Sequence, residues 1–124
     1  MERVTGIGGF FFRAEDPEAL ADWYASMLGA DRVPLSMEDQ PWTQEGGATA
    51  FAPMGRETTM LGDASRSWSI NFRVRDLTAM VAQLRSADVE VEVDPEAYAM
   101  GRFASLADPE GNVVQLWEPA VGEK

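Results

Sequence analysis

The spacing of hydrophobic residues in the first half of the chain predicts a strand, a helix and then three strands. Three phenylalanines at residues 10–12, within a segment spanning residues 5–14, are too few for a helix and follow two glycines, which predicts a buried strand. Asp16 caps a helix that begins at Pro17 and ends at Gly29. Its apolar face consists of Leu20, Trp23, Tyr24, Met27 and Leu28. A strand at residues 32–36 and a hairpin of residues 42–45 and 48–52 follow.

The same order of elements begins again after a loop at residues 55–67. Residues 68–74 predict a strand, and Asp76 caps a helix that runs to about Ala87. Val and Glu alternate over residues 89–93, which predicts a half-exposed strand. Two further strands, residues 103–107 and 113–117, flank a turn that contains proline and glycine, namely Asp108-Pro109-Glu110-Gly111-Asn112.

The two halves align with each other as an internal repeat. A shift of 60 residues places Phe12 on Phe72 and Asp16 on Asp76, and a shift of 66 places residues 51–53 on residues 117–119. Neither half alone can bury both a sheet face and a helix, so we expect a single domain made of two repeats. We call these the first module (residues 5–54) and the second module (residues 67–119).

Composition and charge exclude several classes of function. The 124 residues suit one domain, and 45% of them are hydrophobic. The chain contains no cysteine and no histidine, which excludes disulfides, thiolate chemistry and Ser-His-Asp or Cys-His catalysis. Its net charge of −11 disfavours nucleic acid and anionic membranes as partners, contributes to solubility, and would suit a cationic ligand. Neither a signal peptide nor an apolar run of roughly 20 residues is found, so the cytoplasm is the default expectation.

The end of the chain resembles a known family. Residues 101–112 (GRFASLADPEGN), followed by residues 113–119 (VVQLWEP), are similar to the C-terminal signature of the vicinal oxygen chelate superfamily. That superfamily includes glyoxalase I, extradiol dioxygenases and bleomycin-resistance proteins. Residues 6–13 and the helix containing Trp23 and Tyr24 fit the same pattern. The resemblance implies an α+β fold in which two βαβββ modules form a U-shaped mixed-sheet cup, usually in a homodimer.

Family enzymes hold a divalent metal in that cup, and the resemblance places the four ligand positions at Gly9, Thr49, Ser69 and Gln115. Glycine has no donor side chain, and two hydroxyls with one amide are poor ligands for Zn, Fe or Mn. We therefore expect no metal and no cofactor. Extradiol cleavage, which needs a 2-His-1-carboxylate site, is excluded. A non-standard site built on Glu45 or another acid stays open, because open carboxylate sites bind Mg or Mn.

Alternation along the strands indicates which side chains share the cup-lining face. These candidate ligand-binding residues are Phe11, Arg13, Ser69, Asn71, Arg73, Gln115 and Trp117, with Trp42 near the hairpin as a further candidate. Apolar walls with few polar groups are typical of small-molecule sites, but Phe11 and Trp117 could instead fill the cup as core. Trp42 and Trp68 could be stacking walls or dimer anchors.

The charged candidates have structural alternatives as well. Arg13 and Arg73 could grip a ligand carboxylate or phosphate, or could pair with acids such as Glu15 or Asp76. Glu45, beside the paired glycines, is a weak candidate for a general base and could be an exposed turn residue.

Three functions remain open. The first is a metal-free protein of the bleomycin-resistance kind, which binds a small organic molecule. The second is a lyase, isomerase or epimerase that acts without metal or with a non-standard metal site, using Glu45 or Tyr98 for proton transfer. The third is a module that interacts through its dimer. The missing ligands and the acidic balance favour binding.

Overall fold

The computed structural model describes residues 1–32 and 41–120. Its elements are α1 (Pro17–Leu28), β1 (Ile70–Arg73), α2 (Leu77–Ser86), β2 (Glu92–Val93), β3 (Gly101–Ala107) and β4 (Val113–Pro119). None of the helices in these two ranges is long and apolar enough to cross a membrane. The predicted strand at residues 32–36 lies almost wholly outside the described residues.

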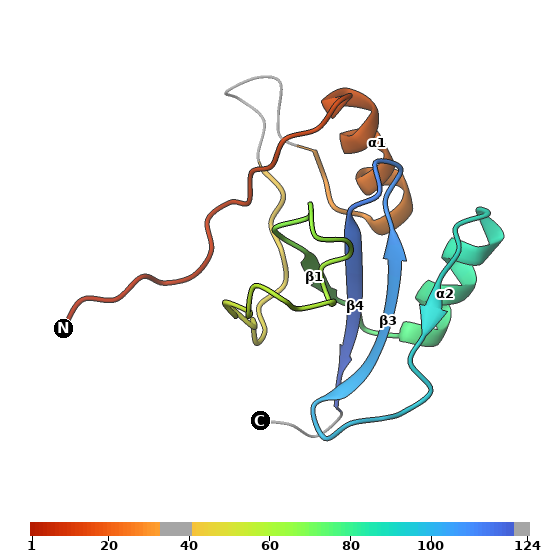
Figure 1. Cartoon of the computed structure of the whole chain (residues 1–124). Coiled ribbons are helices and arrows are strands. Elements are labelled where there is room, and N and C mark those ends of the chain that lie inside the picture. Colours follow the sequence, from red (N-terminus) through yellow and green to blue (C-terminus); the bar gives the residue numbers. More distant parts are fainter. Residues whose placement is uncertain (33–40, 121–124) are drawn as a thin grey trace.

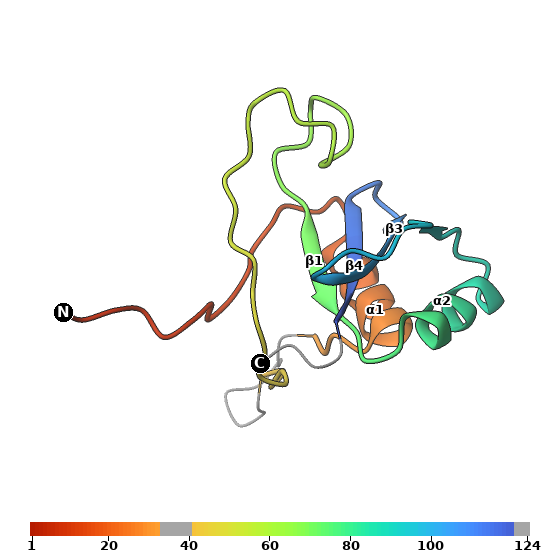
Figure 2. The ribbon, with the colours of Figure 1, turned by 90° about the horizontal axis from the view of Figure 1, so that it is seen from below.

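The strands form one mixed sheet with the order β1-β4-β3-β2. β1 and β4 are parallel, whereas β4 with β3 and β3 with β2 are antiparallel. The parallel pair is joined through α2, as a parallel connection requires. Both helices lie on one side of the sheet, and neither lies on the other side (Figure 1, Figure 2). The α+β fold with an open mixed sheet is therefore confirmed.

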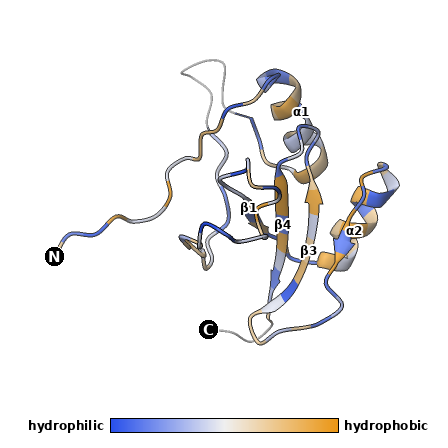
Figure 3. Cartoon of the chain, in the orientation of Figure 1, coloured by the Kyte–Doolittle hydropathy of each residue, from blue (hydrophilic) through white to orange (hydrophobic). Residues whose placement is uncertain are grey.

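The hydrophobic core lies between the helices and the sheet. Leu77 and Leu84 of α2 and Val114 and Leu116 of β4 are at most 1% exposed. Alternate positions of β3 and β4 supply the sheet side of this core, and Figure 3 shows hydrophobic residues along both strands. Period-2 alternation therefore leaves Gln115 and Trp117 on the opposite, helix-free face.

The predicted helix boundaries are confirmed by their caps. Asp16 and Asp76 each accept a hydrogen bond from the backbone N–H three residues later, at 3.1 and 3.0 Å. Gly29 closes α1 with a φ of 74°, a left-handed conformation that glycine adopts without a steric penalty. Both helices therefore begin where the sequence predicts.

A buried carboxylate joins the helix of the first module to the turn of the second. Asp108 is 4% exposed and accepts a hydrogen bond from the Tyr24 hydroxyl at 2.6 Å. It also accepts hydrogen bonds from the Asn112 side chain and from the backbone N–H groups of Glu110 and Asn112. These four donors satisfy a group whose burial would otherwise be costly. Burial, followed by the hydrogen bond to Asp108, raises the pKa of Tyr24.

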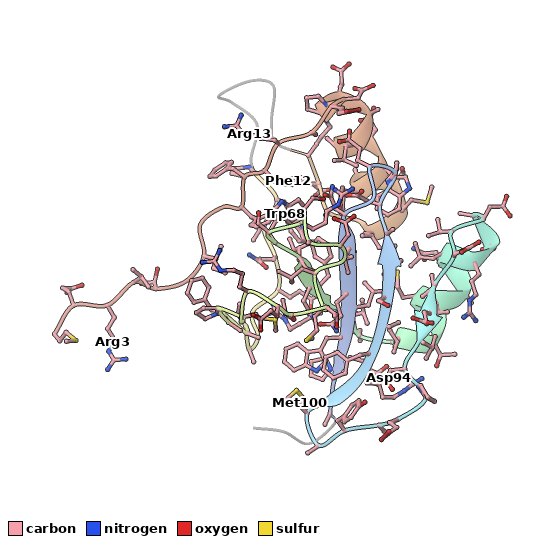
Figure 4. The ribbon with its side chains drawn as sticks, in the orientation of Figure 1. Arg3, Phe12, Arg13, Trp68, Asp94 and Met100 are labelled. Atoms are coloured by element: carbon pink, nitrogen blue, oxygen red, sulfur yellow. The ribbon has the colours of Figure 1, made fainter. Side chains whose placement is uncertain are left out.

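The predicted strands at residues 5–14, 42–45 and 48–52 are not strands in the structure. The N-terminal segment leads away from the body, and Phe11 is 91% exposed (Figure 1). Phe10 and Phe12 pack against Trp68, and their ring centroids lie 5.2 and 4.7 Å, respectively, from that of Trp68. Figure 4 labels Phe12 and Trp68. A hydrophobic run predicts burial, but a strand forms only where its backbone groups pair with another strand, and residues 5–14 make no such pairing. The first module thus contributes α1, while the second has all five elements.

Tyr24→Phe should lower the free energy of unfolding by about 1–3 kcal/mol, because Asp108 stays buried and loses a donor. Urea unfolding followed by circular dichroism measures the change. Tyr98→Phe is the matched control, since the Tyr98 hydroxyl donates to Asp94 at an exposed position, and it should change stability by less than about 0.5 kcal/mol. Equal effects of the two variants would show that Asp108 is not a structural connection.

Candidate functional site

The strand registers place eight side chains in two rows across the helix-free face. In the first row, Asn71 pairs with Gln115, Gln115 pairs with Ser105, and Ser105 pairs with Glu92. Directly paired residues in a sheet point to the same face. This row therefore presents two amides, a hydroxyl and a carboxylate, one from each strand of the sheet.

The second row begins two residues further along β1. Arg73 pairs with Trp117, and Trp117 pairs with Phe103. Asp94, two residues after Glu92, donates its backbone N–H to the Phe103 carbonyl at 3.0 Å and so continues the row. A guanidinium, an indole, a phenyl ring and a carboxylate follow one another from β1 to the end of β2. We call the two rows together the cup floor.

The two amides of the cup floor hold each other. Asn71 Nδ2 donates to Gln115 Oε1 at 2.6 Å. One such bond uses one carbonyl oxygen and one N–H of the pair. Whichever way the two amides are oriented, a second carbonyl oxygen and further N–H groups remain for a ligand. The sequence-based prediction grouped Asn71 and Gln115, and the structure brings them into direct contact.

The two aromatic rings of the second row are stacked. The Phe103 and Trp117 rings have centroids 6.3 Å apart and planes inclined by 7°. The indole Nε1–H of Trp117 donates to the Met100 carbonyl at 2.8 Å, which fixes the ring orientation. Tyr98 packs edge-on against Phe103, and its hydroxyl donates to Asp94 at 2.8 Å, which raises the pKa of Tyr98. These contacts fix the orientation of the Phe103 and Trp117 rings, which together form an apolar surface.

A cavity of about 310 Å³ lies over the β2–β3 side of the cup floor. Its lining includes Phe103, Ser105, Gln115, Glu92 and Asp94. This volume is at the lower end of the range for small-molecule sites, and the lining combines one aromatic ring with several polar groups. Figure 4 shows Asp94 beside the first residues of β3.

Arg73 holds a chain segment instead of an acid. Its guanidinium donates to the Ala48 carbonyl at 2.6 Å and to the Glu45 carbonyl at 2.7 Å. These bonds tether residues 45–48 beside β1. The Glu45 carboxylate meets Arg75 at 2.8 Å in an exposed ion pair. Glu45, the weak candidate for a base, therefore faces a guanidinium and is not part of the cup floor.

The other candidates from the first module lie away from the cup floor. Phe11 is exposed on the N-terminal segment. Trp42 packs edge-on near Phe72, at a centroid distance of 6.4 Å, and Phe72 is paired with the buried Leu116. Arg13 borders a second cavity of about 600 Å³ beside the start of α1, which Arg66 and Glu110 also line. Figure 4 shows Arg13 pointing outward.

The donors at the four family ligand positions do not fit a divalent metal. The Ser69 hydroxyl donates to the Val113 carbonyl at 2.9 Å, and Gln115 Oε1 accepts from Asn71. Thr49 Oγ1 lies 3.4 Å from an Arg73 guanidinium nitrogen, whose charge repels a cation. Gly9 offers no side chain. Within residues 1–32 and 41–120, no three acidic side chains gather into a metal-binding group.

Four residues of the cup floor were not named as candidates from the sequence: Phe103, Ser105, Glu92 and Asp94. Alternation in residues 89–93 does indicate that Glu92 shares a face with Asp94. Alternation does not indicate the order of the strands in the sheet. β2 reaches the site only through its pairing with β3. The sequence pattern could therefore have indicated that these side chains face solvent, but not that they lie near Gln115.

Comparison with known proteins gives matches over most of the chain. Residues 9–117 match the model of a family described as a glyoxalase-like domain. TnmS3, an antibiotic binding protein from Streptomyces sp. CB03234, is 25% identical, with a TM-score of 0.65 over 97% of this chain and 100% of that chain. A glyoxalase/bleomycin resistance protein from the same strain is 26% identical, with a TM-score of 0.52 over 84% and 92% of the two chains.

A third structure, a protein from Bacillus anthracis assigned to the glyoxalase family, is 18% identical and supports the fold alone. Its TM-score is 0.53 over 83% of this chain and 84% of that chain. No curated protein matches the chain.

Purified without added metal, the protein should contain well below one Zn, Ni, Mn or Fe ion per chain, because the side chains at the four family ligand positions carry no charge. Elemental analysis measures this content. As a positive comparison, Ser69→His combined with Gln115→Glu places an imidazole and a carboxylate on one face of neighbouring strands. Calorimetry should show tighter Zn or Ni binding by this variant than by the parent. Stoichiometric metal in the parent would contradict the donor argument.

Proposed function

Because the chain belongs to the glyoxalase-like domain family, we propose that it binds a small organic molecule on the helix-free face of its sheet, without a metal. The observation that carries this proposal is the cavity over β2 and β3, bordered by Phe103 and Gln115. The Phe103 and Trp117 rings form an apolar surface of fixed orientation. Beside them, the Asn71–Gln115 pair has unused donors and acceptors, so the site suits a partly planar molecule with polar substituents.

The likeness to TnmS3 supports a binding role. That protein is an antibiotic binding protein, and the likeness extends over nearly all of this chain. Family membership alone supports binding and catalysis equally, since one fold hosts many functions. The site of this chain therefore has to decide between them.

Binding is better supported than a lyase, isomerase or epimerase activity. A general base must lie within hydrogen-bond reach of the substrate. Glu45 is paired with Arg75 outside the cup floor, and the Tyr98 hydroxyl donates to Asp94. The donors at the family ligand positions, in turn, do not suit a metal. An enzyme would need Glu92 or Asp94 as its base, and both oxygens of Asp94 already accept hydrogen bonds from the Glu96 backbone N–H and the Tyr98 hydroxyl.

We further propose that the protein is a homodimer in which each chain is one domain of two modules, residues 5–54 and 67–119. Large apolar side chains in the first module are exposed: Phe11 at 91% and Phe51 at 86%. β1 is an edge strand, with β4 as its partner on one side. Exposed apolar residues and an open sheet edge both favour association with a second copy.

Gln115→Ala should weaken ligand binding by roughly 1–3 kcal/mol, because it removes one polar contact and leaves the Asn71 amide unpaired. Trp117→Phe should reduce the fluorescence change on binding. Ligands are first identified by mass spectrometry of molecules that co-purify with the native protein, and affinities then come from fluorescence titration. Gln83→Ala is the matched control, since this amide bonds the Met27 carbonyl on the helix side. Ligands indifferent to both Gln115 and Trp117 would place the site elsewhere.

Light scattering coupled to size exclusion at micromolar concentration should give about twice the chain mass of 13.6 kDa. Phe11→Ser should shift the equilibrium toward monomer, because it removes apolar area from the proposed interface. Val4→Ser is the matched control: Val4 is also 91% exposed but precedes the first module. A parent protein found only at the chain mass would refute the dimer.

A further inference from the structure

The cup floor changes in charge from one edge of the sheet to the other. The β1 edge carries Arg73, whose guanidinium is engaged by the carbonyls of residues 45 and 48. The β2 edge carries the carboxylates of Glu92 and Asp94, which border the cavity. Within the part of the chain that the structure describes, the salt bridges join Arg32 to Asp22 and Arg75 to Glu45 and involve neither carboxylate.

From this arrangement we propose that the ligand is a planar aromatic cation: its ring lies against Phe103 and Trp117, and its positive group lies at Glu92 and Asp94. The inference rests on the proposed function and names the chemical class of the molecule bound there. It depends on the cavity and the stacked rings as well as on the two acids.

The geometry sets how far the charge lies from the ring. Phe103 is on β3, and Asp94 continues β2 directly beside it. Neighbouring strands lie about 4.8 Å apart. A positive group one or two bonds from an aromatic ring therefore reaches the carboxylates while the ring stays over Phe103. The faces of Phe103 and Trp117 also attract cations through their π-electrons.

The two carboxylates differ in how they are held. Both oxygens of Asp94 already accept a hydrogen bond, from the Glu96 backbone N–H at 3.0 Å and from the Tyr98 hydroxyl at 2.8 Å. These bonds fix the direction of the carboxylate and leave lone pairs on each oxygen. Glu92 is exposed and can follow a ligand. A carboxylate of fixed orientation beside one whose side chain is free to move suits a cation that carries N–H donors or methyl groups.

The amide pair at the other end of the row adds polar recognition. Asn71 and Gln115 keep one carbonyl oxygen and several N–H groups after bonding each other. A ring substituent such as a hydroxyl or carbonyl can meet these groups while the cation lies two strands away. The cup floor thus accommodates a molecule with its charge at one end and a neutral polar group at the other.

An alternative role for the acids is to protect the sheet edge. Charged side chains on an edge strand discourage pairing with other chains. That role predicts no difference among ligands of different charge beyond what the overall charge of −11 produces. Probes that differ only in charge, and a variant that removes an acidic charge outside the cup floor, separate the two roles.

The experiment uses three 2-naphthylmethyl compounds that differ in one group: trimethylammonium, hydroxyl or carboxylate. Each is titrated by fluorescence into the full-length parent, into Glu92→Gln/Asp94→Asn, and into Gln115→Ala. Glu57→Gln is the charge control, since Glu57 lies in an exposed loop and lines neither cavity. Circular dichroism checks that every variant is folded.

We expect the cation to bind the parent most tightly. The Glu92/Asp94 variant should lose about five- to tenfold in affinity for the cation and little for the neutral probe. Glu57→Gln should leave the order of affinities unchanged. If the probes bind in a Gln115-dependent way but the neutral or anionic one is preferred, the cation inference is overturned while the proposed function stands. If no probe binds in a Gln115-dependent way, both fail.

Discussion

The parallel register between β1 and β4 is the constraint on which the rest of the structure depends. It joins residues 44 positions apart, placing Asn71 beside Gln115 and Arg73 beside Trp117. The connection between these strands runs through α2, which covers one face of the sheet with Leu77 and Leu84. The other face is left for polar and aromatic side chains, so this pairing contributes to both the core and the cup floor.

A buried polar connection joins the two modules on the helix side. Asp108 belongs to the turn that carries β3 into β4, and Tyr24 belongs to α1 of the first module. A carboxylate with four donors is tolerated at 4% exposure only while all the partners stay in place. Hydrophobic packing alone would let α1 slide on the core. This hydrogen bond gives the helix a defined position relative to the turn.

The positions that the family resemblance assigns to metal ligands carry no charged side chain in this sequence, while the fold is retained. The hydroxyl of Ser69 and the amide of Gln115 are bonded within the protein, and Thr49 lies next to a guanidinium. The helix-free face offers stacked rings, amides and two carboxylates at one edge. Recognition by such groups depends on shape, stacking and charge, which is compatible with sequestering a molecule without transforming it.

The sequence by itself determined the two helices and the turn between β3 and β4. Asp16, Asp76 and Gly29 specify helix ends through bonds within a few residues, and the 108–112 turn follows from its proline and glycine. Alternation along each strand separated core from cup, and the C-terminal signature indicated the fold. All of these signals act over short distances along the chain.

Only the tertiary structure decided which strands are neighbours and what each exposed group contacts. Glu92 and Asp94 reach the site because β2 pairs with β3, and Arg73 binds the carbonyls of a distant segment instead of the acids suggested beside it. Residues 5–14 have the composition of a strand, yet they form none in this chain. The physical reason is that a strand and a binding site both depend on residues remote in sequence. Local preference specifies a residue's own conformation, but it does not specify which remote residues it will contact.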